Sequence, residues 1–563
     1  MTHKFKQLSY ILILSVASVG FSFDTGPIKP QLRKLSEHLP SALSQQMEIG
    51  KSVEPETQIS LSIALSWNQE KNLNQTLVDL YDPSSSSFHK FLTSSEFRQK
   101  FAPTEAQITQ VQGFLELYGI QPLSVSDNRL VIHAIGTARE VNEAFHTELV
   151  CFTDKQNQRY FAPIRDLQVP IDSPIQAVFG VENITKAHHH LRKRENLEPV
   201  TGQSLVGTGP RGGFSPSDLK SAYGLSLPLN GAHQTLALFE LDGFDKNDIT
   251  AYAKYFKLRK VPLKTIKVDG VTGKPGDGAG EVTLDIELMT AIAPGAKKIL
   301  VYEGPNTAEG LINTYNKIAT DNCAKVVSTS WGLTENQASP AMLQSENNIF
   351  KQMAAQGQAI YAASGDSGAF DNGKDLGVDD PASQPYVVAV GGTQLSLNQD
   401  GTYFRETTWN QNNTSSGGAS GGGISSMWPI AEWQKAAVNP ASKGSTTNRN
   451  VPDVALNADP NTGYAIFFKG QWNVFGGTSC AAPLWAAFNA LVNQNRTKLH
   501  LSVLGFPSPA LYTLGQSSFY STTFHDITDG STNLWYPAVT GLDNATGWGS
   551  FYGEQLIQNL STH

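Results

Sequence analysis

The sequence predicts an α/β protein with a doubly wound, mostly parallel sheet, preceded by a smaller α+β domain. A chain of 563 residues exceeds one ordinary hydrophobic core, so two or three domains are expected. After residue 213, short apolar runs alternate with helical segments, which is typical of parallel strands joined by helices. The 49 glycines and the charged fraction of 16% favour tight turns and strands buried on both faces.

Composition and the N-terminus indicate an exported globular protein. A net charge of −8 argues against a nucleic-acid partner, because no broad basic face is available. Lys4 and Lys6 precede the apolar run 10–20 and small residues up to Ser22, which predicts a signal peptide over residues 1–22. No later stretch is long and apolar enough to span a bilayer, so we expect a secreted monomer without a membrane anchor after signal removal.

Three cysteines are too few for a disulfide framework. Cys323 and Cys480 could form a single disulfide if they lie close together. The alternative, which we prefer, is a buried free thiol at Cys480.

Residues 23–186 are predicted to form the smaller domain, with ordered structure from about residue 57. Prolines interrupt the leader, whereas strands and helices alternate from residue 58 to about Val181. The expected strands are 59–64 and 130–135, the expected helices are 72–80, 104–118 and 138–145, and residues 150–161 are expected to form a hairpin.

Residues 187–212 are predicted to form an exposed, cleavable linker. A cluster of histidine, lysine and arginine leads here into a Gly- and Pro-rich passage without apolar periodicity. Composition permits an uncut tether between the domains equally well. A metal site is the third alternative, although His188, His189 and His190 cannot all face one ion without ligands from elsewhere.

The larger domain, residues 213–563, is predicted from repeated strand and helix units. Active sites of doubly wound sheets lie beyond the carboxyl ends of the strands, so acids and serines at those ends are candidates for chemistry. The expected strands are 235–240, 298–302, 326–330, 359–363 and 386–390, and the expected helices are 216–223, 246–256, 308–320 and 345–356.

Two acids one helical turn apart are the first candidates. Glu281 and Asp285 lie in a segment with a helical pattern up to about Ala293, so both project from one face. Like charges at this spacing repel each other, and the apolar neighbours disfavour full exposure, so at least one pKa should rise. A solvated surface pair is the alternative.

Asp366 and Ser479 also stand at strand ends beside glycines. Asp366 directly follows the apolar strand 359–363, although acids in turns are common. Ser479 follows two glycines and precedes the apolar run 481–491, which places it at the start of a buried helix. Close backbone approach and free N–H groups favour a nucleophile there, whereas an ordinary helix-capping serine is the alternative.

A serine nucleophile normally uses a histidine base, and none is well placed in the larger domain. Its histidines, at positions 233, 500, 525 and 563, lie outside acid-rich or Gly-rich strand ends. We therefore expect a carboxylate base. Such a base works best in acid, where a neighbouring aspartic acid can stay protonated and donate a hydrogen bond.

Taken together, these residues resemble the sedolisins, serine-carboxyl peptidases with a subtilisin-like fold and an activation domain of the pro-kumamolisin type. The resemblance covers about 58–560, and its many ordered matches exclude chance better than any one of them. The matching segments are 82–85, 88–93 and 160–163 in the smaller domain, and 364–368, 380–383, 391–393, 421–423, 452–454 and 477–479 in the larger one, with Glu281, Asp285 and Tyr386.

The resemblance implies a role for each candidate. Ser479 would be the nucleophile, Glu281 the general base and acid, Asp285 the residue that orients Glu281, and Asp366 the oxyanion donor. A neutral carboxylic acid can donate to a tetrahedral oxyanion together with a backbone N–H. The resemblance further implies a ferredoxin-like activation domain and two outer supporting residues, Glu240 and Trp331.

The C-terminal segments 525–530 and 537–543 resemble the calcium loop of this family. The implied ligands are all oxygen atoms, which suits a Ca²⁺ ion. They are the carboxylates of Asp526 and Asp543 and the carbonyls of Ile527, Val539 and Gly541. Val539 replaces the usual glycine and Leu542 the usual tryptophan, and a metal-free turn is the alternative.

The sequence thus predicts a secreted, acid-acting serine endopeptidase made as a zymogen. Its substrates would be proteins or peptides, and its own N-terminal domain would be an intramolecular inhibitor. Two rivals remain: a histidine-dependent subtilisin relative, and a catalytically inactive secreted binding protein on the same fold.

Overall fold

The computed structural model describes residues 31–35, 48–194, 207–411 and 417–562. The predicted signal peptide lies outside these residues, as do residues 195–206 of the predicted linker. Among the helices of the described part, none has the length and apolar character needed to cross a membrane.

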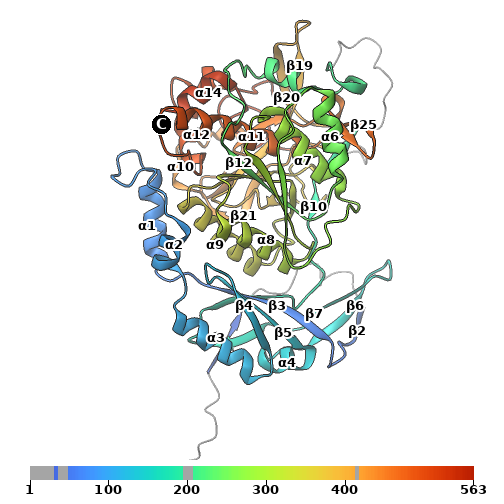
Figure 1. Cartoon of the computed structure of the whole chain (residues 1–563), viewed down its shortest axis with the longest axis vertical. Coiled ribbons are helices and arrows are strands. Elements are labelled where there is room, and N and C mark those ends of the chain that lie inside the picture. Colours follow the sequence, from blue (N-terminus) through green and yellow to red (C-terminus); the bar gives the residue numbers. More distant parts are fainter. Residues whose placement is uncertain (1–30, 36–47, 195–206, 412–416, 563) are drawn as a thin grey trace, which may run out of the picture.

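The larger domain is built on an eight-stranded sheet (Figure 1). Its order is β13-β14-β12-β15-β17-β19-β20, and β23 also pairs with β19. Every pair is parallel except β19 with β20, so the predicted doubly wound, mostly parallel sheet is confirmed. The strands are β12 (Thr235–Glu240), β13 (Leu263–Lys267), β14 (Lys298–Glu303), β15 (Val326–Thr329), β17 (Ala359–Ala363), β19 (Val388–Leu397), β20 (Tyr403–Thr408) and β23 (Val454–Asn457).

Helices cover both faces of this sheet. The helices α7 (Ala279–Ile292) and α11 (Thr478–Lys498) pack against each other on one face, while α8 (Ala308–Asp321) and α9 (Pro340–Ala355) cover the other. The first turns of α7 and α11 carry the predicted acids and serine, so this pair of helices positions the candidate site. Helix α6 (Lys246–Tyr255) flanks α7.

The smaller domain has the predicted ferredoxin-like arrangement. Its antiparallel sheet has the order β4-β5-β3-β9, with three helices between the first two strands in sequence and one helix between the last two. The elements are β3 (Gln58–Leu65), α3 (Glu105–Leu117), β4 (Gln121–Val125), β5 (Val131–Thr137), α4 (Ala138–Ala144) and β9 (Ile175–Phe179). The predicted hairpin is β6 (Leu149–Thr153) with β7 (Arg159–Pro163).

Ordered structure begins earlier than residue 57, so that expectation is wrong. Strand β1 (Leu32–Leu35) pairs with β8 (Leu167–Pro170), and β2 (Glu48–Ser52) extends the hairpin through β6. Both strands obtain their hydrogen bonds from segments more than 90 residues away in sequence, a partner that local composition cannot reveal.

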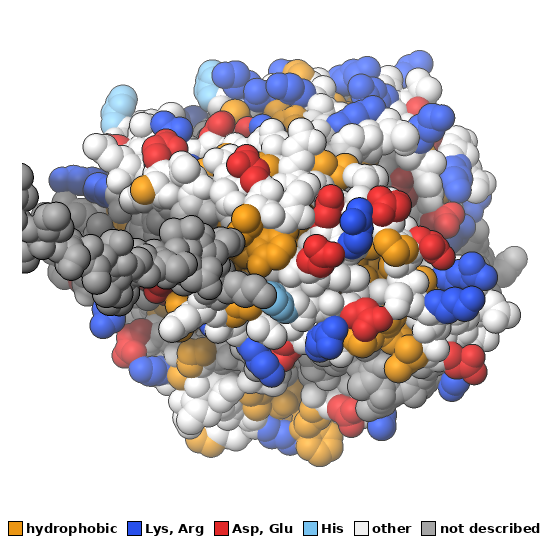
Figure 2. All heavy atoms as spheres, turned by 90° about the horizontal axis from the view of Figure 1, so that it is seen from below, with side chains coloured by type: hydrophobic (Ala, Val, Ile, Leu, Met, Phe, Trp, Pro, Cys, Tyr) orange, Lys and Arg blue, Asp and Glu red, His pale blue; other side chains and the backbone are white. Residues whose placement is uncertain are grey.

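The smaller domain docks on α8 and α9 of the larger one, below them in Figure 1. Helices α1 (Glu70–Tyr81) and α2 (Ser94–Phe101) extend from it along the side of the larger domain. The Trp67 indole donates to the Asn348 carbonyl at 3.0 Å, and the Tyr81 hydroxyl donates to the Ala354 carbonyl at 2.7 Å. On the face seen in Figure 2, basic and acidic side chains are intermixed.

Sequence periodicity located the longer elements well and missed several short ones. Helix α9 begins at Pro340, five residues before the expected start, because Ser339 accepts the Met342 N–H as its N-cap and proline suits the first helical position. The remaining elements of the larger domain are β16 (Trp331–Thr334), β18 (Asp379–Asp380), β21 (Gly423–Pro429), β22 (Asn448–Val451), β24 (Tyr464–Phe468), β25 (Gln471–Gly476), β26 (Phe524–His525), β27 (Ser550–Phe551), α5 (Pro216–Ala222), α10 (Glu432–Lys435), α12 (Ser508–Gly515), α13 (Tyr520–Thr523) and α14 (Gly553–Leu560), with short 3-10 turns at Pro210–Gly212, Pro440–Ser442 and Pro460–Thr462.

The first part of the linker is not exposed as predicted. It forms two short strands, β10 (His188–His189) and β11 (Arg192–Lys193), that pair with β16 and β25 of the larger domain. Ala187, His190 and Arg194 are buried. The expected exposure is therefore wrong for this stretch, because its polar composition is satisfied by the larger domain instead of by water.

Candidate active site

Ser479 lies in the first turn of α11, directly beyond β25. Gly477 precedes the helix with φ 101°, a conformation that glycine adopts without strain. A Cβ at this position would stand 2.0 Å from the His190 carbonyl oxygen and 2.8 Å from an Asp366 carboxylate oxygen. Glycine is therefore required here so that the linker can approach the serine.

Glu281 and Asp285 project from α7 toward this point and are completely buried. Burial and the neighbouring Glu240 carboxylate raise the pKa of Glu281 well above its usual value, and the Ser479 hydroxyl partly offsets this rise. Burial and the charge of Glu281 likewise raise the pKa of Asp285, which accepts a hydrogen bond from the Ser330 hydroxyl at 2.9 Å. The expected pKa rise thus applies to both acids of the pair.

Glu240 and Trp331 lie behind the pair, where the resemblance placed them. The Trp331 indole donates to Glu240 at 2.8 Å, and burial together with the Asp285 carboxylate raises the pKa of Glu240. A chain of buried acids therefore runs from Glu240 through Asp285 to Glu281 and ends at Ser479. Such closely spaced acids share protons and titrate as a group.

Asp366 faces the start of α11 from the end of β17. It accepts hydrogen bonds from the Thr478 backbone N–H at 2.8 Å and from the Thr478 hydroxyl at 3.0 Å. Its second carboxylate oxygen pairs with Arg192 of the linker at 3.2 Å. Burial raises the pKa of Asp366, while the positive charges of His190 and Arg192 act in the opposite direction.

The linker crosses the site as an extended chain. Upstream of His190, His188 and His189 pair with Gly332 and Trp331, and the His190 N–H donates to the Ser330 carbonyl at 3.2 Å. At His190 itself, the Ser479 backbone N–H donates to the carbonyl oxygen at 3.2 Å. Downstream, the chain continues as β11 along β25. The His190 carbonyl is thus the one held at the serine.

Side chains of the linker also reach the buried acids. His189 Nδ1 lies 3.6 Å from Glu281 Oε2, and its ring packs edge-on against Trp331 at a centroid distance of 5.5 Å. Leu191 lies beside Gly280, where an added Cβ would be 3.8 Å from Leu191 Cδ1. The linker therefore covers both the buried acid pair and the serine.

Sequence reasoning missed two groups of functional residues. Ser330 contacts both Asp285 and the linker backbone, and its position at the end of β15 beside Trp331 was a usable signal. The sequence predicts His190 and Arg192 as part of an exposed linker, and no local signal indicates that they lie beside Ser479 and Asp366. All three cysteines are free, so Cys323 and Cys480 do not pair.

In the predicted calcium loop, Asp543 is buried and Asp526 is partly exposed. Burial raises the pKa of Asp543 to about 7 and also raises the pKa of Asp526. Backbone N–H groups of Gly541 and Val539 donate to Asp526 and Asp543 at 3.0 and 2.9 Å. Val539 is not among the residues with positive φ, so the loop accepts its Cβ. Neither carboxylate makes an ion pair with a described Lys, Arg or His, and carboxylate oxygens suit a hard cation.

Two family descriptions match the chain. Residues 45–184 match the pro-kumamolisin activation domain, and residues 271–549 match the subtilase family. These ranges correspond to the smaller domain and to most of the larger one.

Two relatives are similar to most of the chain. Kumamolisin from Bacillus sp. (strain MN-32) is 39% identical over 446 residues, which cover 76% of this chain and 78% of the relative. Sedolisin from Pseudomonas sp. (strain 101) is 33% identical over 516 residues, with 87% and 84% covered. The chain belongs to the sedolisin family.

A solved structure supports the same assignment for this sedolisin-family chain. Pseudomonas sedolisin, described as a serine-carboxyl proteinase complexed with two molecules of pseudo-iodotyrostatin, superposes with a TM-score of 0.57 at 31% identity. The match covers 63% of this chain and 100% of that chain. The protein is thus a serine-carboxyl peptidase with a subtilase-like catalytic domain and an N-terminal activation domain.

Proposed function

We propose that this sedolisin-family peptidase is a secreted, acid-acting endopeptidase made as a zymogen, which removes its activation domain by cutting its own linker. One observation carries the proposal: the linker lies in the cleft as a substrate would, with the His190 carbonyl oxygen on the Ser479 N–H. The predicted signal peptide supports secretion, and the net charge of −8 argues against a nucleic-acid partner.

The first bond to be cut is His190–Leu191. A serine peptidase attacks the carbonyl that its oxyanion donors hold, and the Ser479 N–H holds that of His190. The linker backbone pairs with β16 upstream of this bond and with β25 downstream of it. These pairs fix the register of the linker, because a shift by one residue in either direction would break them.

In this reaction, Glu281 takes the proton of the Ser479 hydroxyl as its oxygen attacks the His190 carbonyl carbon. The same proton passes to the leaving nitrogen of Leu191, which frees the downstream chain and leaves an acyl-enzyme. Water then attacks with Glu281 again as base, and the acid product leaves. Asp285 orients Glu281 throughout, and neutral Asp366 donates to the oxyanion beside the Ser479 N–H.

The raised pKa values suit work in acid. Asp366 donates only while protonated, and burial extends that state to higher pH than an exposed aspartate allows. Glu281 must accept a proton, so the acid cluster has to carry net negative charge. Activity should therefore fall at low pH, where Glu281 can no longer accept a proton, and at high pH, where Asp366 has lost its proton. The apparent pKa values of both falls belong to the whole acid cluster.

The path of the linker favours an endopeptidase over an enzyme that removes short N-terminal peptides. The linker continues upstream beyond the third residue before the scissile bond. The fourth residue, Ala187, donates its N–H to Asn306 Oδ1 at 2.8 Å and accepts from Asn306 Nδ2 at 2.7 Å, and the chain then continues into the activation domain. A cleft that accepts this longer chain upstream has no barrier after the third residue.

A calcium ion in the C-terminal loop is part of the proposal. Asp526 and Asp543 would hold it with the carbonyls of Ile527, Val539 and Gly541, and it would neutralise two carboxylates whose pKa values burial raises. Removal of the ion with a chelator should lower the melting temperature, and Asp543→Asn should abolish that response.

Incubation of the purified precursor in acid, at about pH 4, tests the proposal directly. We expect a new N-terminus at Leu191 and the simultaneous appearance of peptide hydrolysis. The Ser479→Ala precursor should stay intact, and Glu281→Gln and Asp366→Asn should be strongly impaired. Equally rapid cutting of Ser479→Ala would refute self-processing, and activity of wild type at neutral pH only would refute acid action.

A further inference from the structure

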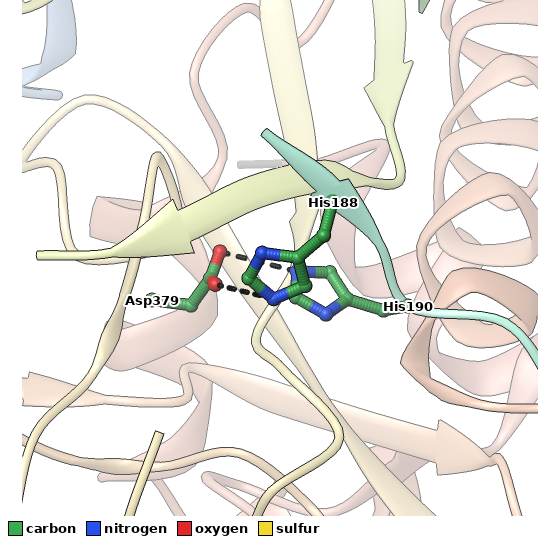
Figure 3. A group of neighbouring side chains, drawn as sticks. All are labelled: His188, His190 and Asp379. Atoms are coloured by element: carbon green, nitrogen blue, oxygen red, sulfur yellow. Dashed lines mark ion pairs between the residues drawn. The ribbon is translucent and has the colours of Figure 1, made fainter. Parts of the chain in front are cut away.

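Two linker histidines and one catalytic-domain acid form a compact group (Figure 3). His190 Nε2 lies 3.2 Å from Asp379 Oδ1, and His188 Nε2 lies 4.0 Å from Asp379 Oδ2. One ligand atom from each residue falls within 4.8 Å of the others. The two imidazole rings meet edge to face with centroids 4.8 Å apart.

The extended backbone of the linker explains why two of three consecutive histidines converge. Side chains alternate between the faces of a strand, so His188 and His190 point to one side and His189 to the other. His189 accordingly approaches Glu281 and Trp331. Three residues in sequence thus serve two different sites, one of which the proposed catalysis does not use.

The polar atoms of the group lack other partners. Asp379 is completely buried, and neither of its carboxylate oxygens accepts a hydrogen bond within the described residues. The Nε2 atom of His190, which is 2% exposed, also makes none there. Both oxygens of the nearby Asp371 are unpartnered in the same part of the chain. Buried polar atoms without hydrogen bonds are costly, so this arrangement calls for a ligand.

We propose that His188, His190 and Asp379 bind one divalent transition-metal ion of the Zn²⁺ type, in a site that exists only while the linker lies in the cleft. Zinc bonds of about 2.0–2.1 Å at tetrahedral angles place neighbouring ligand atoms about 3.3 Å apart. The 3.2 Å separation of His190 and Asp379 matches this edge. Two imidazoles and one carboxylate suit zinc, whereas calcium prefers oxygen ligands alone.

Access and the fourth ligand follow from exposure. The His188 side chain is 53% exposed, so an ion can enter from solvent and a water molecule can complete the tetrahedron. His188 needs only a small side-chain rotation to bring Nε2 closer to Asp379, because its ring is free on the solvent side.

Ion pairs of His190 and His188 with Asp379 are the competing explanation. They need no ion at this site, so any metal bound elsewhere should keep its affinity in His188→Ala. A metal ion would satisfy both histidines and the carboxylate together. It would also tie the linker to the catalytic domain through side chains from both, in addition to the backbone pairing.

The consequence for maturation depends on the proposed function, whereas the site itself does not. A metal that joins the upstream side of the scissile bond to Asp379 would hold the cut linker in the cleft and delay its release. Zinc should therefore slow the appearance of peptide hydrolysis in wild type and have no such effect in His188→Ala.

Metal binding by the Ser479→Ala precursor tests the site without requiring activity. The metal-free protein is titrated with Co²⁺ and Zn²⁺ by absorption and calorimetry at neutral pH, with Ca²⁺ in excess to occupy the proposed calcium loop. We expect one equivalent bound with tetrahedral Co²⁺ bands. His188→Ala and Asp379→Asn should each weaken binding at least about tenfold.

His189→Ala is the matched control, because it alters the same linker but points away from the group; it should keep the binding. Equal affinity in His188→Ala and wild type, or no saturable binding, would overturn the inference. His188 is half-exposed, so its variant should fold even if Asp379→Asn does not. Mature enzyme that lacks the linker should bind no Co²⁺ at this site, and retention there would also overturn it.

Discussion

His89 is expected to act as an acid-sensitive contact between the activation domain and the catalytic domain. Its ring lies between Phe88 and Phe91, and its Nδ1 accepts a hydrogen bond from Arg496 Nη2 of the catalytic domain at 2.9 Å. Burial and then the positive charge of Arg496 lower the pKa of His89 from 6.5 to about 4. A proton on Nδ1 would break the hydrogen bond and place two cations side by side.

The magnitude follows from the two pKa values. A lowered histidine pKa means that docking is fully stable above about pH 6.5 and loses stability as the pH falls through about 4. At pH 7 both the docked and the detached domain carry neutral His89. At pH 5 the detached form is almost fully protonated and the docked form is not, which disfavours docking by about 2 kcal/mol, or roughly 30-fold.

His89→Asn removes the titration and keeps the geometry. His89 has φ 50°, a left-handed conformation that asparagine tolerates, and the Asn side-chain oxygen can accept from Arg496 in place of Nδ1. We expect wild-type self-cleavage to accelerate between pH 7 and 5 and the variant to respond less by about one order of magnitude. In precursors that also carry Ser479→Ala, hydrogen exchange of residues 88–92 should increase in acid when His89 is present. It should stay unchanged in His89→Asn.

His146→Asn is the matched control, since His146 has the same φ of 50°, lies in the same domain and is exposed. It should mature as wild type does. An unchanged acid response in His89→Asn, with normal docking at pH 7, would refute the assignment of this histidine as the acid-sensitive contact.

Three further predictions concern the catalytic domain. Glu281→Gln should lower kcat by about 10³-fold or more with little change in KM, measured with a peptide substrate in acid, because it removes the proposed base and leaves the cleft intact. Arg192→Gln should accelerate self-cleavage near neutral pH, followed by gel analysis of the precursor, because its ion pair with Asp366 favours the ionised acid; slower cleavage would contradict this. Burial raises the pKa of Asp380 from 3.8 to about 7. The stability that protonated Asp380 contributes is therefore full below pH 3.8 and is lost as the pH rises through 7. Asp380→Asn should reduce the fall in melting temperature between pH 4 and 8, measured in the Ser479→Ala precursor.

Much of the fold and of the candidate site could be predicted because local chemistry determines it. The expected strand 235–240 coincides with β12, and its terminal Glu240 lies at the carboxyl end of a parallel strand as that pattern requires. Four-residue spacing on a helix suffices to bring Glu281 and Asp285 to one face. Both signals depend only on neighbouring residues.

Features that depend on distant partners were not predictable in this way. Strand β13 has the sequence LKTIK and is only half-buried, so it shows neither a continuous apolar run nor a clean alternation. The linker strands β10 and β11 are two residues each, and their hydrogen bonds come from β16 and β25, about 140 and 280 residues away in sequence. A charged, Gly-rich segment is typically exposed to solvent. The linker lies against the larger domain only because its strands pair with β16 and β25.

In the proposed maturation, the linker both presents the scissile bond and restrains its cleavage, and the two effects come from residues two positions apart. The His190 carbonyl oxygen already accepts a hydrogen bond from the Ser479 N–H, so one oxyanion contact of the proposed reaction is present in the precursor. Two residues later, Arg192 pairs with Asp366 and favours its ionised form, in which it cannot donate to an oxyanion. The backbone thus orders the reactants while a side chain withholds a proton that the transition state needs. Acid supplies that proton without moving the chain, so the precursor can be fully positioned for cleavage and still remain intact at neutral pH.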